Sequence, residues 1–123
     1  MSDRPDPRSS PGRHQLITCI VQRGKADDAV KAALRAGAPA ATISFARGTG
    51  IRERLGLLKI AISPEKEVIE IVVPAEVADA VFDALVDAAK LTTPGMGFIY
   101  SIPVERALIS TERPDTGGHG GVP

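Results

Sequence analysis

The chain has 123 residues, and its 15 basic and 15 acidic side chains cancel to a formal net charge of zero. This length suits one compact domain with tails and is too short for two ordinary domains. The balanced charge favours neither nucleic acid nor an anionic membrane surface as a partner, so an anion site on this chain must be local.

No apolar run reaches the roughly 20 residues of a membrane span, and the start of the chain lacks the apolar segment of a secretion signal. The single cysteine, Cys19, lies in the apolar run LITCIV. It excludes a disulfide within the chain and suits a reducing compartment. We therefore expect a cytoplasmic protein without membrane insertion, in which Cys19 is a buried small side chain rather than a catalytic thiol.

The two ends of the chain differ in composition from its middle. Pro, Ser, Arg and Asp are concentrated in residues 1–13, and the chain closes with the glycine-rich stretch TGGHGGVP. Such segments bury too little apolar surface to order themselves. We expect a disordered tail at residues 1–13, one domain at residues 14–113 and a flexible tail at residues 114–123.

The first half of the domain reads as strand, helix and strand. Residues 14–21 form a short buried strand that ends before Gly24. Residues 40–47 alternate in polarity, which predicts a second strand lying beside the first. Between them, helical spacing predicts an apolar stripe that ends at Gly37 and consists of Ala26, Ala29, Val30, Ala33 and Leu34.

The second half begins with residues 48–64, where glycines, charges and one proline predict a long loop, with a hairpin as the alternative. Residues 68–73 form a strand that Pro74 ends, and residues 98–104 form a strand whose Pro103 favours a sheet edge or a bulge. Between these strands lies the clearest helix, residues 75–90. Its predicted buried side chains are Val77, Val81, Leu85 and Ala88 or Ala89, and its solvated acids are Glu76, Asp79, Asp83 and Asp87.

The resulting order, βαββαβ, predicts an α+β ferredoxin-like fold, a four-stranded antiparallel sheet with both helices on one face. Side chains of a strand alternate between the two faces, so the face away from the helices needs another cover. We expect copies of the same chain to supply it in a homo-oligomer.

The segments ITCIVQRGKADDAVKAALRAG, TISFARGTG, IEIVVP and PGMGF resemble the PII signal-transduction protein family, with gap-free spacing inside each half of the domain. The resemblance implies a homotrimer that binds an adenine nucleotide in each cleft between subunits. It also implies a switching T-loop at residues 48–64 and a phosphate-binding B-loop at residues 92–97. Such a protein is a sensor, not an enzyme, and needs no cofactor.

The resemblance also assigns nucleotide-binding residues. Ile20, Thr42, Glu70 and Val72 would line the adenine pocket, and Gly48, Thr49 and Gly50 would form the base of the T-loop. The B-loop would present backbone N–H groups to the phosphates from Gly95, Met96 and Gly97, with a simple turn after a helix as the structural alternative. Pro94, which precedes them, is assigned to the same nucleotide site. We expect a bulky residue in place of Gly95 or Gly97 to block phosphate and leave the fold intact.

The chain departs from the family at the places that carry charge. Thr93 and Phe98 stand where the B-loop of relatives has lysines, and Ile109 and Thr111 stand where they have C-terminal arginines, with Arg106 and Arg113 close by. A phosphate site with fewer cations favours ADP or AMP over ATP, because a triphosphate has more negative charge to neutralise. Candidates to replace the missing lysines are Arg47, Arg52, Arg54, Arg106 and Arg113, although each alone is more often an ordinary solvated surface arginine. Of these, Arg106 and Arg113 are assigned to the nucleotide site, and Arg47, Arg52 and Arg54 to an anion site or T-loop switch.

The loop at residues 48–64 is short and has no tyrosine that could be uridylylated, since the only tyrosine is Tyr100. This resembles the carboxysome-associated PII-like subgroup, which responds to bicarbonate together with adenine nucleotide. The target protein would be a bicarbonate transporter or a carboxysome-related protein. The alternatives are a nitrogen-regulatory protein that binds ATP and 2-oxoglutarate, and a structural or metal-tolerance trimer of the same fold.

Overall fold

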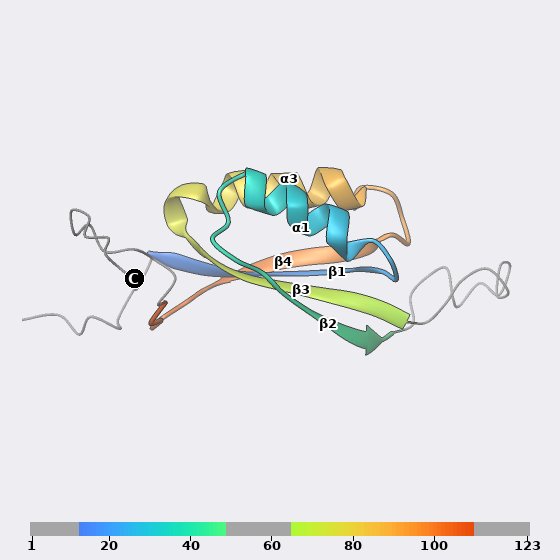
Figure 1. Ribbon diagram of the computed structural model, residues 1–123, viewed down its shortest axis with the longest axis horizontal. Helices are drawn as coiled ribbons and strands as arrows, with labels where there is room; N and C mark the ends of the chain where they lie inside the picture. The colour runs from blue at the N-terminus through green and yellow to red at the C-terminus, as the bar shows by residue number, and fades with distance from the viewer. Residues whose placement is uncertain (1–12, 49–64, 110–123) are drawn as a thin grey trace, which may run out of the picture.

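One antiparallel sheet carries two helices on the same face in the computed structural model (Figure 1), which describes residues 13–48 and 65–109. The elements in chain order are β1 (His14–Gln22), α1 (Ala26–Arg35), β2 (Thr42–Arg47), β3 (Glu65–Pro74), α3 (Ala75–Ala89) and β4 (Gly97–Pro103). The predicted βαββαβ order and ferredoxin-like fold are confirmed. The expectations for residues 1–12, 49–64 and 110–123 lie outside the described residues.

The strands lie in the order β2-β3-β1-β4, and every neighbouring pair is antiparallel. The expectation that the strand at residues 40–47 lies beside the first strand is wrong, because β2 pairs with β3. The segment that contains α1 leads from β1 to a strand that is not its neighbour in the sheet. The β3 strand then lies in the position between β1 and β2. The β4 strand pairs with β1 at the edge of the sheet, as Pro103 predicts.

The core lies between the sheet and the helices. Alternate residues of β1 and β3 point toward the helices, and their side chains are almost fully buried: Ile17, Cys19, Val21, Ile69, Ile71 and Val73. Burial raises the pKa of the Cys19 thiol to about 11, which keeps it protonated at neutral pH. Cys19 is therefore the predicted small core side chain.

The buried side chains of helix α1, which packs against α3 and β3, are alanines. Ala26, Ala29 and Ala33 are buried and Val30 is partly buried, as predicted. Leu34 is the exception, because 45% of its surface is exposed although the stripe included it. Leu34 lies one residue before the end of the helix at Arg35.

Helix α3 buries Val81, Leu85 and Ala89 against the sheet, as predicted, together with Ala78. Val77 is only partly buried and lies against Gly37, where an added Cβ atom would come 3.1 Å from Val77 Cγ1. The four acids of α3 are all exposed, as expected for a solvated face. Within the described residues, neither helix is long and apolar enough to cross a membrane.

A carboxylate from β3 completes the start of α1. The residue before α1, Lys25, makes no side-chain cap hydrogen bond. Instead Glu67 Oε1 accepts hydrogen bonds from the backbone N–H groups of Gly24, at 3.0 Å, and Ala26, at 2.8 Å. A carboxylate at this position satisfies unpaired N–H groups of the first turn and opposes the positive end of the helix dipole.

Replacing Glu67 with alanine should lower the free energy of unfolding by about 1–2 kcal/mol, because two N–H groups at the start of α1 lose their acceptor. Urea denaturation followed by circular dichroism measures the change. The matched control is Glu105→Ala, at an exposed position, which should change stability by less than about 0.5 kcal/mol. Equal stability of the two variants would contradict the capping role.

Candidate functional site

The face of the sheet opposite the helices is open in the single chain and mostly apolar. One row of directly opposed residues crosses all four strands and consists of Thr42, Glu70, Thr18 and Tyr100. Around this polar row lie apolar side chains that are half-buried or exposed, namely Leu16, Ile20, Val68, Val72, Phe98 and Ile102. The Phe98 and Tyr100 rings stack with their centroids 6.2 Å apart.

A pocket of about 430 Å³ opens on this face near the start of β2. It contains Thr42, Glu70 and Val72, which are three of the four residues predicted to line an adenine pocket. The rest of its wall is mostly apolar and comes from Leu16, Pro39, Ala40, Ala41 and Ile109. Ile20 is on the same face but does not line the pocket. An apolar wall with one carboxylate suits a flat ring that donates a hydrogen bond.

The turn between α3 and β4 lies at the opposite end of the β strands. Lys90 adopts a left-handed conformation after α3, and the chain then turns through hydrogen bonds from Thr93 N–H to the Lys90 carbonyl and from Met96 N–H to the Thr93 carbonyl. The Met96 N–H is thus already paired, so the expectation that it serves a phosphate does not fit this conformation. Gly95, with a φ of 86°, adopts a conformation that favours glycine.

The structure gives a steric reason for a glycine at position 97 that does not involve phosphate binding. A Cβ atom added there would lie 2.1 Å from the Ile20 carbonyl oxygen and 3.2 Å from Leu91 Cδ2, and the φ of Gly97 is 141°. The backbone of β1 fills the space that a side chain would need. The expectation that a bulky residue at position 97 leaves the sheet intact is therefore wrong.

The structure adds two residues that the sequence reasoning missed, Lys66 and Gln22. Lys66 is only 9% exposed, and its Nζ donates a hydrogen bond to Gln22 Oε1 at 3.2 Å. Gln22 Nε2 donates in turn to the carbonyl oxygen of Gly95 at 2.7 Å. This cluster of Lys66, Gln22 and Gly95 places a cation beside the turn. The alternation along β3 that places Glu70 and Val72 on the open face also places Lys66 there.

Several of the predicted site residues do not line the pocket at Thr42 or lie outside the described residues. Gly48 lies beside Lys66, since an added Cβ atom would be 3.7 Å from Lys66 Cγ. Pro94 and Arg106 are exposed. Predicted residues outside the described ranges are Thr49, Gly50, Arg52, Arg54 and Arg113.

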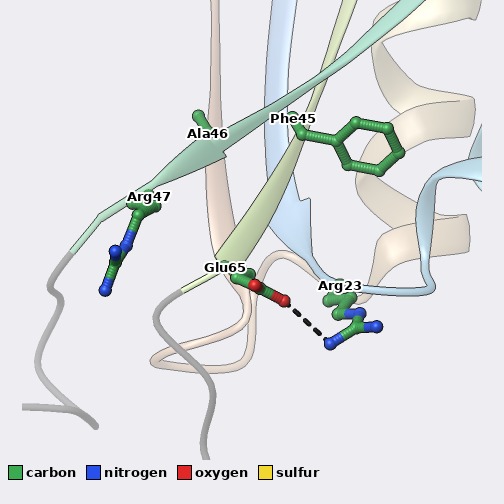
Figure 2. A pocket seen from close by; sticks show the side chains of 5 residues that line it. All are labelled: Arg23, Phe45, Ala46, Arg47 and Glu65. Carbon is green, nitrogen blue, oxygen red and sulfur yellow. Dashed lines mark hydrogen bonds and ion pairs between the residues drawn. The ribbon is translucent and has the colours of Figure 1, made fainter.

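Arg47 lines a different hollow from the one that contains Thr42. Figure 2 shows this second pocket, of about 300 Å³, at the end of β2, with walls from Arg23, Phe45, Ala46, Arg47 and Glu65. Arg23 and Glu65 form an ion pair across it at 2.8 Å. By alternation, Phe45 and Arg47 belong to the helix side of the sheet, so Arg47 lies on the opposite face from Thr42 and Lys66.

Comparison with known proteins decides the classification. The model of the family described as nitrogen regulatory protein P-II matches residues 14–113. The chain belongs to the P-II family. Among solved structures, Arabidopsis thaliana PII bound to citrate matches with a TM-score of 0.57 and 22% sequence identity, over 76% of this chain and 78% of that chain. A comparison with curated proteins finds no match.

The expected resemblance to the PII family is thereby confirmed. P-II proteins are regulatory proteins that bind small-molecule effectors and target proteins. At this level of identity, the likeness to the Arabidopsis protein shows the fold, and citrate is a ligand of that protein. The adenine and phosphate assignments in this P-II family member remain predictions.

Replacing Gly97 with alanine should destabilise the protein severely, because the new Cβ atom meets the Ile20 carbonyl and the backbone must shift. Thermal unfolding measures the effect. The matched control is Gly24→Ala, which has a similarly unfavourable φ of 87° but nothing within 4 Å of the added atom. Its cost should stay near 1 kcal/mol. Equal stability of the two variants would show that the close approach at Gly97 is unimportant.

Proposed function

We propose that this P-II family chain is a sensor that binds adenine nucleotides, ADP or AMP in preference to ATP. One observation carries the proposal: the pocket at Thr42 and Glu70 and the cation Lys66 lie on the same open face of the sheet. Lys66 and Glu70 are four positions apart on β3, which corresponds to about 13 Å along a strand. That separation suits a nucleoside diphosphate lying along β3 with its base at Glu70.

Each end of this surface has chemistry for one part of the ligand. At the base end, the Glu70 carboxylate can accept a hydrogen bond from the amino group of adenine, and Val72 offers an apolar wall. At the phosphate end, Lys66 can supply a charge-assisted hydrogen bond, and the turn at Gly95 lies beside it. With one lysine in this cluster, a diphosphate or monophosphate is easier to neutralise than a triphosphate.

We further propose that the open face is covered in a homotrimer, with each nucleotide site completed by a neighbouring subunit. The large exposed side chains of β4 support this, since Phe98, Tyr100 and Ile102 are each about half exposed in the single chain. A contiguous apolar surface of this kind marks an interaction site.

The proposed output of the sensor is a change in the segment 48–64 that a target protein reads, in the cytoplasm and without catalysis. Arg52 and Arg54 in this segment can bind a second anion, for which bicarbonate is our first choice. The target would then belong to inorganic-carbon metabolism, as a bicarbonate transporter or a carboxysome-related protein. The rival candidates are a nitrogen regulator that binds ATP and 2-oxoglutarate, and a structural or metal-tolerance trimer.

Isothermal titration calorimetry should show binding of ADP and AMP that is tighter than binding of ATP. Lys66→Gln should weaken ADP binding about 10- to 100-fold, because a charge-assisted hydrogen bond to phosphate is lost. The control is Lys31→Gln on an exposed position of α1, which should leave binding unchanged. A parent protein that binds none of the three nucleotides would refute the sensor and favour the structural trimer.

Hydrogen exchange tests the proposed output. Exchange in peptides that cover residues 48–64 should slow when ADP binds, and slow further with bicarbonate, because new contacts offset the entropy cost of ordering that segment. Peptides from α1 (Ala26–Arg35) are the internal control and should not change. Slowing by ATP with 2-oxoglutarate, but not by ADP with bicarbonate, would support the nitrogen-regulatory alternative instead.

A further inference from the structure

Gln22, the last residue of β1, connects three parts of the chain that are far apart in sequence. Its side chain accepts a hydrogen bond from Lys66, at the start of β3, and donates one to Gly95, in the turn that follows α3. The second of these bonds spans 73 positions of the chain. Gln22 is partly buried, and the proposed function gives it no contact with the nucleotide.

The chemistry of the two partners leaves only one orientation for the Gln22 amide. An ammonium group such as Lys66 Nζ can only donate, and a carbonyl oxygen such as that of Gly95 can only accept. A flipped amide would place its NH₂ group against the ammonium and its oxygen against the carbonyl, so both contacts would be repulsive. The Gly95 carbonyl thus orients the amide, and the oriented amide oxygen holds Lys66.

A glutamine suits this position better than the side chains closest to it in shape. Glutamate would still accept from Lys66, but it could not donate to the Gly95 carbonyl and would offset the charge of the lysine with its own. Methionine would fill similar space and make neither hydrogen bond. A neutral amide holds the ammonium in place without adding an opposing charge.

We propose that Gln22 is a positioning residue for the phosphate end of the nucleotide site. It sets the location of the Lys66 ammonium relative to the turn at Gly95, so that the ammonium meets the phosphates without rearrangement. Preorganised donors bind an anion more tightly than donors that must first be ordered. This inference rests on the proposed function, because it assigns a role within the same site.

The experiment compares ADP with adenosine, which lacks phosphate, in calorimetric titrations of the parent and of Gln22→Met. The variant should bind ADP about tenfold more weakly, since Lys66 loses its hydrogen bond to Gln22, and adenosine within about twofold of the parent. Gln22→Glu should weaken ADP binding further, because its carboxylate offsets the lysine charge. Gln15→Met, the same change on the same strand and outside the cluster, is the matched control and should change neither affinity.

A double-mutant cycle shows whether Gln22 acts through Lys66. In the Lys66→Gln background, Gln22→Met should change ADP affinity by less than about twofold, because there is no ammonium left to position. A full tenfold effect in that background would overturn the positioning role. So would an equal loss of ADP and adenosine affinity, which indicates general damage to the fold.

Failure of this inference can be told apart from failure of the proposed function. If the parent binds ADP and Gln22→Met binds it equally well, Gln22 has no positioning role and the sensor proposal stands. If the parent itself binds no ADP, the sensor proposal falls, and the positioning role falls with it. Thermal unfolding of each variant, alone and with saturating ADP, checks that the folded proteins are being compared.

Discussion

The antiparallel pairing of β1 with β3 is the constraint on which both the core and the candidate site depend. Its register runs from His14 opposite Pro74 to Gln22 opposite Lys66. Because side chains alternate between faces, this register places Cys19 under the helices and brings Gln22 beside Lys66. A slip of one residue would send the core side chains to the open face and separate the cluster, so the core and the candidate site require the same pairing.

The turn between α3 and β4 is bound to β1 in two ways. The Ile20 carbonyl occupies the space beside Gly97 that a side chain would need, and the Gln22 amide binds the Gly95 carbonyl. The first contact is steric and demands a glycine, whereas the second is a hydrogen bond that orients the turn. A glycine-rich loop beside a proposed phosphate site can therefore owe one glycine to packing and another to its conformation.

The proposed ligand site and the proposed subunit interface share the open face of the sheet. Its apolar side chains favour contact with another subunit. Its polar row, together with Lys66 four residues from Glu70 along β3, favours a charged ligand with a flat ring. Nucleotide binding and assembly would thus be coupled through one surface. The hollow around Arg23 and Arg47 belongs to the helix side, which leaves it outside that coupling.

The sequence by itself determined the element order, because periodicities of two and 3.6 residues are local properties of the chain. Its resemblance to the PII family singled out Thr42, Glu70 and Val72, which line one pocket in the structure. Tertiary structure alone decided that β2 joins β3, that Glu67 caps α1 and that Gly97 is enclosed by Ile20. It also made Lys66 part of a site. In its local context Lys66 is an ordinary charged residue near a strand end, and only the meeting of β1, β3 and the turn after α3 supplies the partners that hold it.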